Sequence, residues 1–255
     1  MIELSPQRIA AAAGARIARE ASGGRPDRAE IDSRLIAGGE LFFGLPGTEA
    51  DGGEFAPAAI EAGAWGVLVG RRWAGELSEA VPEGRDPWIF ASEDPLASLQ
   101  RLATAWRHEL AVPVVGITGS VGKTSVKDIA RALLPVRTHA SPQNFNTEVG
   151  LPLAILSAPS ETEVLVLEMA MRGVGQIAEL CRIAEPDVAA ITNVGPVHLE
   201  LLGTLEAIVE AKAEILAGLR PEGRAVVPVE AEALAPHLDD SLDALSFGPG
   251  GDVFA

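Results

Sequence analysis

A glycine-rich loop between an apolar strand and a predicted helix is the first candidate for chemistry. The strand VVGIT (114–118) runs directly into GSVGKTS. Glycines let successive backbone N–H groups face inward, and a helix N-terminus adds partial positive charge, so such a loop suits phosphate groups. Lys123 can reach β- and γ-phosphates, and the hydroxyl of Thr124 suits Mg²⁺. We therefore predict a nucleotide-binding loop formed by Gly119, Ser120, Val121, Gly122, Lys123, Thr124 and Ser125.

The loop departs from the strict phosphate-loop pattern, G-x-x-x-x-G-K-[ST], at its first position. That pattern would place a glycine at position 117, where the chain has Ile117, and Gly116 and Gly119 flank it. The alternative is an ordinary glycine-rich turn between a strand and a helix. The strand before the loop, the helix after it and the intact GKT favour nucleotide binding.

Polar residues also follow two other apolar strands. VLVLE ends in Glu168, and AAITNVGPVH carries Asn193 and His198. In open parallel sheets, ligands bind beyond the carboxyl ends of the strands, so these residues are candidates for the same site. Glu168 could complete a Mg²⁺ shell. Each residue alone could be structural, as a helix cap or a hydrogen-bonded loop residue, but together they favour a site.

Lys212 lies at the centre of an apolar helix face. At 100° per residue, the face of the predicted helix 204–219 also carries Leu205, Ile208, Val209, Ile215, Leu216 and Leu219. A buried lysine is unfavourable unless it is paired or neutral. Two interpretations stay open: the amine extends along the surface into solvent, or it reacts with CO₂ to form a carbamate that can bind a metal ion.

The second half of the chain predicts a parallel sheet of the phosphate-loop ATPase type, because short apolar strands alternate with helices. The predicted strands are 112–118, 163–168, 187–194 and 224–229, and the predicted helices are 123–134, 175–184 and 204–219. The chain stops soon after the strand-like DVFA with no closing helix, so we expect this ATP-binding domain to be incomplete.

The first half predicts a smaller α/β domain. Its expected helices are 5–18, 55–64 and 95–110, its expected strands are 29–34, 39–47, 65–70 and one beginning at Trp88, and a loop is expected from Arg71 to Pro87. Val112 and Pro113 break the last helix. We therefore place the domain boundary near residue 110, giving domains of 1–110 and 111–255.

Composition restricts the class of protein. The net charge of −16 argues against nucleic acid as a partner, because phosphate backbones need clustered Lys and Arg. No apolar run approaches the length of a membrane span, and the N-terminus lacks the features of a signal peptide, so a cytoplasmic protein without a membrane partner is expected. Cys181, the single cysteine, lies in a helical apolar pattern and is interpreted as a core thiol. We expect a monomer.

Long motifs resemble those of the Mur ligases, ATP-dependent enzymes of peptidoglycan synthesis. The segment 31–69, beginning IDSRLIAGGELFFGLPG, is similar to their N-terminal UDP-binding domain, and VVGITGSVGKTS to their ATP loop. QNFNTEVGLP and EMAMRGVGQIAEL are typical of the member that joins D-alanyl-D-alanine to UDP-N-acetylmuramoyl-tripeptide. The resemblance implies that reaction, an acyl-phosphate intermediate, and an acceptor-holding C-terminal domain that is absent here.

The resemblance also implies roles for individual residues. ATP would be held by the loop, with Lys123, His198 and Lys212 catalytic. Mg²⁺ would be bound by Thr124, Glu168 and His198, with Lys212 as a carbamate beside a second ion. Substrate contacts would come from Ser33 and Arg34 toward UDP, and from Asn144, Asn146 and Thr147 toward the muramoyl peptide or its acyl phosphate.

Three segments depart from the family pattern. The family's Asp-Gly-His is Asp51-Gly52-Gly53 here, its Asn-x-Asp is Pro228-Val229-Glu230, and its NFNN is NFNT. The first two changes weaken the expected UDP-side and nucleotide contacts. Two alternatives stay open: another member of the superfamily, either the ligase that adds the third residue or folylpolyglutamate synthase, and a nucleotide-binding module without catalysis.

Overall fold

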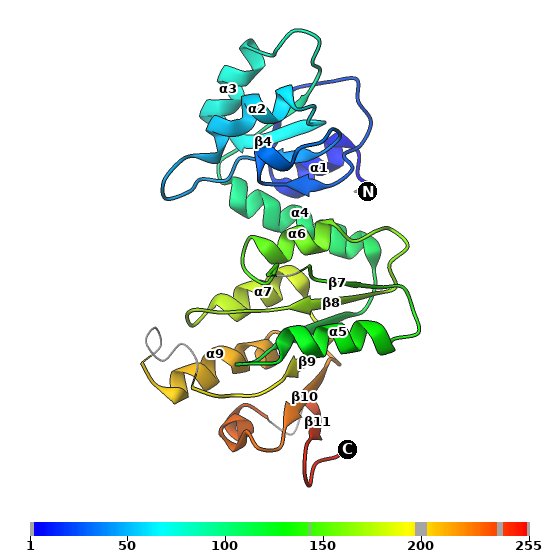
Figure 1. Ribbon diagram of the computed structural model, residues 1–255, viewed down its shortest axis with the longest axis vertical. Helices are drawn as coiled ribbons and strands as arrows, with labels where there is room; N and C mark the ends of the chain where they lie inside the picture. Colours follow the sequence, from blue (N-terminus) through cyan, green and yellow to red (C-terminus); the bar gives the residue numbers. More distant parts are fainter. Residues whose placement is uncertain (1–2, 143, 197–202, 239–241, 254–255) are drawn as a thin grey trace. The chain divides into compact units, whose positions relative to one another are not determined.

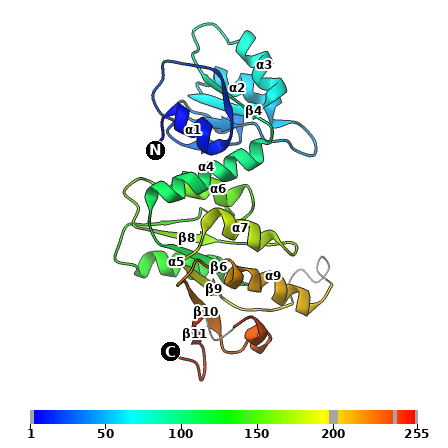
Figure 2. The same cartoon turned by 180° about the vertical axis from the view of Figure 1, so that it is seen from behind.

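Two α/β units make up the chain in the computed structural model, which describes residues 3–142, 144–196, 203–238 and 242–253 (Figures 1 and 2). The first unit contains Met1–Glu109 and Leu156–Ser160, and the second contains Leu110–Ile155 and Glu161–Ala255. Each unit has its own sheet. The predicted α/β fold with a parallel-sheet second half is confirmed.

The first unit has a five-stranded sheet in the order β1-β5-β4-β3-β2, parallel except for β1. Its strands are β1 (Arg16–Arg19), β2 (Ala29–Glu30), β3 (Leu41–Phe43), β4 (Gly66–Gly70) and β5 (Trp88–Ser92). Its helices are α1 (Pro6–Ala13), α2 (Ala56–Glu61), α3 (Arg71–Glu79) and α4 (Pro95–Leu110), with 3₁₀ helices η1 (Ser33–Leu35) and η2 (Gly52–Phe55).

The predicted helix 5–18 is correct at its start and wrong at its end. Ser5 caps α1 by accepting from the backbone N–H of Arg8, and Pro6 occupies the first helical position. The helix ends at Ala13 because Gly14 adopts a left-handed conformation, with φ of 63°. The residues that follow form β1, which pairs antiparallel with β5.

Two further predictions in this unit are wrong. The expected loop from Arg71 to Pro87 contains α3, which buries Ala74 and Leu77, three residues apart, and leaves its charged residues in solvent. The expected strand 29–34 ends at Glu30, because the side chain of Asp32 accepts from the N–H of Arg34 and starts η1. In both segments the amino-acid composition suggested the wrong structure. A short apolar face determines the helix in the first segment, and a local capping hydrogen bond ends the strand in the second.

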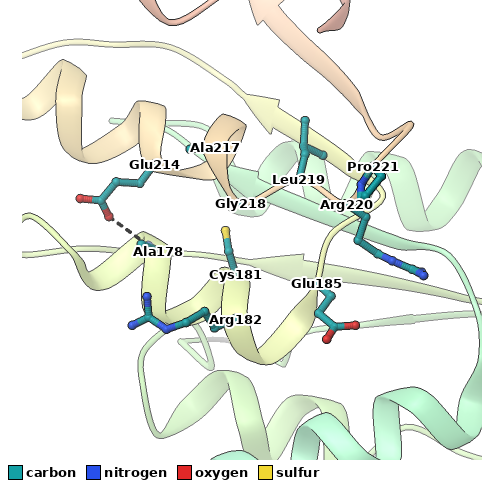
Figure 3. A pocket seen from close by; sticks show the side chains of 10 residues that line it. All are labelled: Ala178, Cys181, Arg182, Glu185, Glu214, Ala217, Gly218, Leu219, Arg220 and Pro221. Carbon is teal, nitrogen blue, oxygen red and sulfur yellow. Dashed lines mark hydrogen bonds between the residues drawn. The ribbon is translucent and has the colours of Figure 1, made fainter. Parts of the chain in front are cut away.

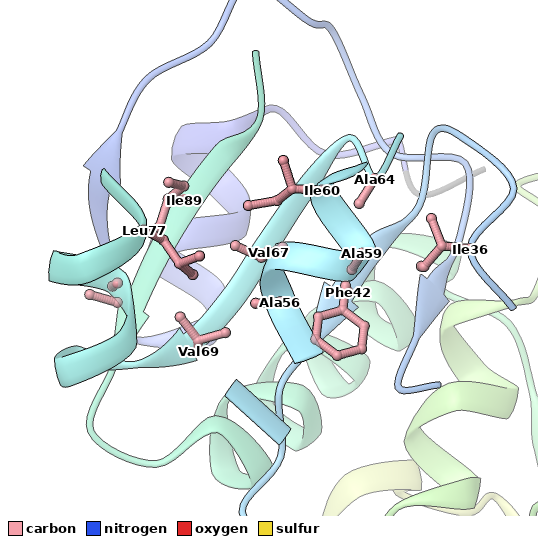
Figure 4. Packing of buried hydrophobic residues seen from close by; sticks show 12 residues of the cluster. Ile36, Phe42, Ala56, Ala59, Ile60, Ala64, Val67, Val69, Leu77 and Ile89 are labelled. Carbon is pink, nitrogen blue, oxygen red and sulfur yellow. The ribbon is translucent and has the colours of Figure 1, made fainter. Parts of the chain in front are cut away.

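Side chains from three neighbouring strands form the core of the first unit. Phe42, Val67 and Ile89 come from β3, β4 and β5 and pack with Ala56 and Ile60 of α2 (Figure 4). All five are nearly inaccessible to solvent. The face that buries apolar side chains therefore fixes the strand register in this unit.

The second unit has a six-stranded, wholly parallel sheet in the order β11-β10-β9-β6-β8-β7. Its strands are β6 (Val114–Thr118), β7 (Thr138–Ala140), β8 (Val164–Glu168), β9 (Val188–Ile191), β10 (Arg224–Pro228) and β11 (Asp243–Phe247). The helix α5 (Lys123–Leu133) lies on one face, and α7 (Gln176–Ala184) and α9 (Leu205–Ala217) lie together on the other (Figures 1 and 2).

The sequence predicted four strands of this sheet, β6, β8, β9 and β10, and the helices α5, α7 and α9, but missed four elements. These are β7, α6 (Gly150–Leu156), the 3₁₀ helix η3 (Glu232–His237) and β11. β7 has only three residues, too few for a periodic pattern, and lies at the edge of the sheet. The segment of α6, GLPLAIL, contains a proline and a leading glycine, which disfavour a helix in isolation.

Gly53, at the first departure from the family pattern, packs directly against Trp73. A Cβ atom at Gly53 would lie 2.1 Å from Cδ1 of Trp73, so the indole already fills the space that a larger residue would need. The guanidinium of Arg72 lies 4.9 Å from the centre of that ring. A larger side chain at position 53 would therefore require the indole of Trp73 to move.

We expect Gly53→Ala to lower the free energy of unfolding of the first unit by about 1–3 kcal/mol, the usual effect of overpacking. All four tryptophans, Trp65, Trp73, Trp88 and Trp106, belong to this unit, so urea unfolding followed by tryptophan fluorescence reports on it alone. Gly75→Ala is the matched control, because nothing lies within 4 Å of its Cβ position on the exposed face of α3. Equal stability of the Gly53→Ala variant and the parent would contradict this packing argument.

Candidate active site

The carboxyl ends of three adjacent strands meet at one point of the second sheet. β6 lies between β8 and β9, so the chain leaves β6 toward one side of the sheet and later returns on the other. Such a switch point opens a crevice where ligands bind in parallel α/β sheets. The loop after β6, Glu168 at the end of β8 and Asn193 after β9 are brought together here.

The glycines of the loop after β6 are required by its backbone. Gly119 has φ of 149°, and a Cβ there would lie 1.9 Å from Oγ1 of Thr192. Gly122 has φ of 84° and precedes α5 without a side-chain cap. The first N–H groups of α5 thus face the loop without a capping side chain, the arrangement that favours an anion.

Asn193 fixes the shape of this loop. Its Oδ1 accepts hydrogen bonds from the backbone N–H groups of Ser120 and Val121, both at 2.9 Å. The hydroxyl of Thr192 donates to the carbonyl of Val121 at 2.6 Å, and the N–H of Gly195 donates to Oγ of Ser120 at 2.8 Å. In this structure Asn193 therefore supports the loop from β9 by occupying two of its N–H groups.

Lys123 begins α5 and lies back over the loop. Its Nζ donates to the carbonyl of Gly119 at 2.9 Å. The side chain is partly buried, with its ammonium beside the glycines where the sequence predicts phosphate. A lysine held by a single backbone carbonyl can exchange that carbonyl for a phosphate oxygen with little rearrangement.

Glu168 is a buried carboxylate with a donor on each oxygen. Oε2 accepts from the hydroxyl of Thr124 at 2.9 Å, and Oε1 accepts from Nδ2 of Asn146 at 2.9 Å. Its own backbone N–H donates to Oγ of Ser141 at 3.1 Å. The structure thus places Thr124, Asn146 and Glu168 in one hydrogen-bonded group at the phosphate loop.

Lys212 is buried in α9, with 2% of its surface exposed, which excludes the surface interpretation. Burial, followed by the positive charge of Lys123, lowers the pKa of its amine from 10.5 to about 8. Among the residues that the structure describes, no carboxylate forms an ion pair with it. The amine therefore gives up its proton more readily than an ordinary lysine does.

An unpaired hydroxyl lies on the same side of the sheet. Oγ1 of Thr118, at the end of β6, is buried and has no hydrogen-bond partner in the described part of the chain. Gly116, two residues earlier, faces Ile215 of α9 at 3.3 Å from its Cβ position, so Thr118, on the same face of β6, points to the side of the sheet that carries α9. A buried hydroxyl without a partner marks a place where a further polar group fits.

The described residues include no cluster of three His, Cys, Asp or Glu side chains that could hold a metal ion. Mg²⁺ in nucleotide sites is commonly held by one or two protein oxygens together with phosphates and water, so Thr124 and Glu168 fit that chemistry. His198, predicted as another metal ligand, lies outside the described residues.

The remaining predicted residues near this site have different surroundings. Asn144 is exposed and adopts a left-handed conformation, with φ of 64°. Thr147 Oγ1 accepts from the N–H of Gly150 at the start of α6, at 3.4 Å, and so caps that helix. Only Asn146 of the three contacts the Thr124–Glu168 group through its side chain.

Ser33 and Arg34 lie in the first unit, at a groove of about 490 Å³ that they line with Ile31, Asp32 and Phe55. The guanidinium of Arg34 donates to both oxygens of Asp32, at 2.8 and 2.6 Å. These hydrogen bonds lower the pKa of Asp32 from 3.8 to about 2. Arg34 remains largely exposed, and a neighbouring exposed ring, Phe55, contributes to a groove whose lining is mostly apolar.

A second groove, of about 600 Å³, lies at the amino ends of the strands of the second unit and away from the phosphate loop (Figure 3). Its lining includes Leu219 and Pro221, which precede β10, and Cys181, whose side chain points toward Gly218. Cys181 is buried, as predicted, and burial followed by the charge of Glu214 raises its pKa to about 12. This thiol is therefore not a nucleophile.

The sequence missed three residues that shape the site: Thr192, Ser141 and Lys127. Thr192 and Ser141 act through contacts between segments far apart in the chain, which no local pattern reveals. The composition could have pointed to Lys127, because the chain has only three lysines, at positions 123, 127 and 212, and the other two were already candidates for the site.

The fold and this loop define an α/β protein of the phosphate-loop class. The family model described as "Mur ligase middle domain" matches residues 117–251, and the one described as "Mur ligase family, catalytic domain" matches residues 28–108. The chain belongs to the Mur ligase family.

Curated relatives carry the name UDP-N-acetylmuramoyl-tripeptide–D-alanyl-D-alanine ligase. The protein of Synechocystis sp. is 41% identical over 198 residues, which are 77% of this chain and 42% of that protein. The protein of Bacillus subtilis is 42% identical over 194 residues, 75% of this chain and 41% of its own length. The protein of Mycobacterium tuberculosis is 38% identical over 255 residues, covering 92% of this chain and 50% of that protein. The chain thus spans about half the length of these relatives.

Two solved structures agree with these relatives. A crystal structure of MurF from Acinetobacter baumannii matches 98% of this chain and 55% of its own, with a TM-score of 0.85 and 28% identity. MurF from Thermotoga maritima in complex with ADP matches 88% of this chain and 51% of its own, with a TM-score of 0.76 and 37% identity. In the described part of this chain, no helix is long and apolar enough to cross a membrane.

We expect Lys212 to titrate with a midpoint of about 8 in CO₂-free buffer. Since its pKa is lower in the folded state than in the unfolded chain, the folded state binds fewer protons between pH 8 and 10.5. The free energy of unfolding of the second unit should therefore rise with pH across that interval. Lys212→Met should remove the dependence.

The chain's three lysines make the measurement direct. Lysine labelled with ¹³C at Cε gives one signal per residue, and Lys212→Met assigns the relevant one. A Lys212 signal that titrates near the ordinary lysine value of 10.5 would contradict the lowered pKa of this buried amine.

Proposed function

We propose that this chain forms the UDP-substrate and ATP-binding part of a ligase that joins D-alanyl-D-alanine to UDP-N-acetylmuramoyl-tripeptide in peptidoglycan synthesis. The observation that carries the proposal is the Thr124–Glu168–Asn146 group at the end of a phosphate loop, because it joins the ATP motif to the NFNTEVGLP segment. The names of the relatives support the same reaction.

In this proposal the triphosphate of ATP lies over Gly119–Ser125. The open N-terminus of α5 and the ammonium of Lys123 face that position, and both favour the negative charge of phosphate. The similarity to a MurF structure that holds ADP supports this placement. Asn193 would contribute by shaping the loop, and Ser125 by its place in the first turn of α5.

Mg²⁺ would be held by Thr124 and Glu168 together with phosphate oxygens, with His198 as a further ligand. We also propose that Lys212 reacts as a neutral amine with CO₂. The resulting carbamate would place a negative charge at the buried end of the Lys212 side chain, where it would bind a second ion. ¹³C-labelled bicarbonate should then give one carbamate signal that Lys212→Met lacks.

The proposed reaction has two steps. A carboxylate oxygen of the tripeptide attacks the γ-phosphorus of ATP, which releases ADP and forms an acyl phosphate. The amine of D-alanyl-D-alanine then attacks the acyl carbon, loses a proton and expels phosphate, leaving an amide bond. Carboxylate and triphosphate repel each other, so Lys123 must neutralise charge where they meet. The bound metal ion supplies further neutralisation of the phosphates.

Unit 1 would hold the UDP end of the tripeptide substrate. The mostly apolar groove at Ser33, Arg34 and Phe55 offers an exposed guanidinium and an exposed ring, which suit a diphosphate and a base. Asn144 and Thr147 would lie on the peptide side of the second unit. A cytoplasmic monomer is the form we propose.

Lys123→Ala should weaken ATP·Mg²⁺ binding by about 100-fold, the order expected when a charged partner of a phosphate is lost. Isothermal titration calorimetry on this chain measures the change. Arg131→Ala is the matched control, because Arg131 is an exposed cation two turns further along α5. If Lys123→Ala binds ATP as tightly as the parent, the phosphate-loop assignment is wrong.

Arg34→Ala should weaken binding of UDP-N-acetylmuramoyl-tripeptide by about 10-fold while leaving ATP affinity unchanged. Arg25→Ala, an exposed arginine of the same unit, serves as the control. Calorimetry with the tripeptide and, separately, with UDP alone distinguishes loss of the nucleotide contact from loss of the peptide contact. Undiminished tripeptide affinity in Arg34→Ala would remove this groove from the proposal.

A further inference from the structure

Lys127 is buried on a helix whose apolar residues are exposed. It is the only residue of α5 that the structure finds buried, with 3% of its surface exposed. Val126, Ile129 and Leu133 of the same helix are 37%, 57% and 77% exposed. Hydrophobic burial alone would have buried the apolar residues and exposed the lysine. A specific contact must therefore hold the lysine side chain in the interior.

The ammonium of Lys127 contacts Ser141, which follows β7, and the neighbouring Asp128. Nζ of Lys127 donates to the carbonyl of Ser141 at 3.0 Å and forms an ion pair with Oδ1 of Asp128 at 3.3 Å. Ser141 is itself buried and bound twice to β8: its N–H donates to the carbonyl of Val166 at 3.0 Å, and its Oγ accepts from the N–H of Glu168 at 3.1 Å. Lys127 therefore binds Ser141, and Ser141 is fixed to β8 beside Glu168 by two hydrogen bonds.

The contact between Lys127 and Ser141 joins two segments that both donate a hydrogen bond to Glu168. Lys127 lies one turn after Lys123 and Thr124, and Thr124 donates to Oε2 of Glu168. Beyond Ser141 the chain continues to Asn146, which donates to Oε1 of Glu168. Lys127 thus ties the phosphate-loop helix to the segment that holds the other side of Glu168.

Composition supports a role beyond packing. The chain has 17 arginines and only three lysines, and all three lysines belong to α5 or α9 at the phosphate-loop end of the second sheet. Lysine places a compact charge on a flexible stem, which suits a buried position beside one carbonyl and one carboxylate better than the planar fork of arginine. The other two lysines, Lys123 and Lys212, are proposed members of the nucleotide site.

We propose that Lys127 is a positioning residue that sets Glu168 and Asn146 for the cation of the bound nucleotide, without touching the nucleotide itself. The inference rests on the proposed function, since it deepens the role of the same site. A positioning role differs from a purely structural role in its effect on ATP binding. Loss of Lys127 should weaken only the part of ATP binding that depends on Mg²⁺, because the phosphate loop and Lys123 stay in place.

The test is calorimetric titration of this chain with ATP, once in excess Mg²⁺ and once in EDTA. For Lys127→Met the gain in ATP affinity that Mg²⁺ produces should fall by about 10-fold, the effect of losing a residue behind a metal ligand. ATP affinity in EDTA should stay at the parent value. Arg131→Met, which removes an exposed cation from the same helix, should change neither quantity.

Ser141→Ala provides a second variant that leaves every charge in place. It removes the acceptor of the Glu168 N–H but keeps the carbonyl that Lys127 binds. We expect the same selective loss of the Mg²⁺ effect. This variant decides the matter if circular dichroism shows that Lys127→Met is unfolded.

Equal loss of ATP affinity with and without Mg²⁺ would overturn the proposal, because a structural tie predicts that result. An unchanged Mg²⁺ effect in the folded variants would overturn it as well, while leaving the proposed function intact. If the parent chain shows no Mg²⁺-dependent ATP binding, the proposed function and this inference fail together.

Discussion

One buried carboxylate organises the second unit. A carboxylate removed from water must be met by hydrogen-bond donors, and Glu168 receives one on each oxygen, from Thr124 and Asn146. These donors come from the phosphate-loop helix and from the segment between β7 and α6. The requirement to satisfy Glu168 therefore fixes both segments against the end of β8. The hydrogen bonds to Glu168 therefore bring together the phosphate loop, the helix α5 and the irregular segment after β7. These segments share no local sequence pattern.

The distribution of charge also favours the phosphate-loop end of the second sheet. The chain carries a net charge of −16, which repels a triphosphate over most of its surface. Its three lysines gather at the helices of the phosphate-loop end, where Lys123 remains able to meet phosphate, Lys127 is bound to a carbonyl and Lys212 is buried. The acidic surface and the local cluster together favour binding at one place.

Sequence alone predicted the long elements and the central residues of the site, because these depend on local patterns. Apolar strands followed by polar residues identified Glu168, and helical periodicity identified the buried face of Lys212. Short elements such as β7 gave no period, and the helix at Arg71–Glu79 was hidden by its charged composition. The predicted contact of Asn193 with the nucleotide stays a prediction. The hydrogen bonds that its Oδ1 accepts from the loop were not predicted, because they join residues 72 or 73 positions apart, which only the folded chain reveals.

The claim that the lysines surround one nucleotide site can be measured directly. With ¹³Cε-labelled lysine, the chain should give three lysine signals, which Lys123→Ala, Lys127→Met and Lys212→Met assign. Addition of ATP with Mg²⁺ should shift all three, most strongly that of Lys123. If calorimetry shows that ATP binds while the three signals stay unmoved, the nucleotide lies elsewhere and the account is wrong.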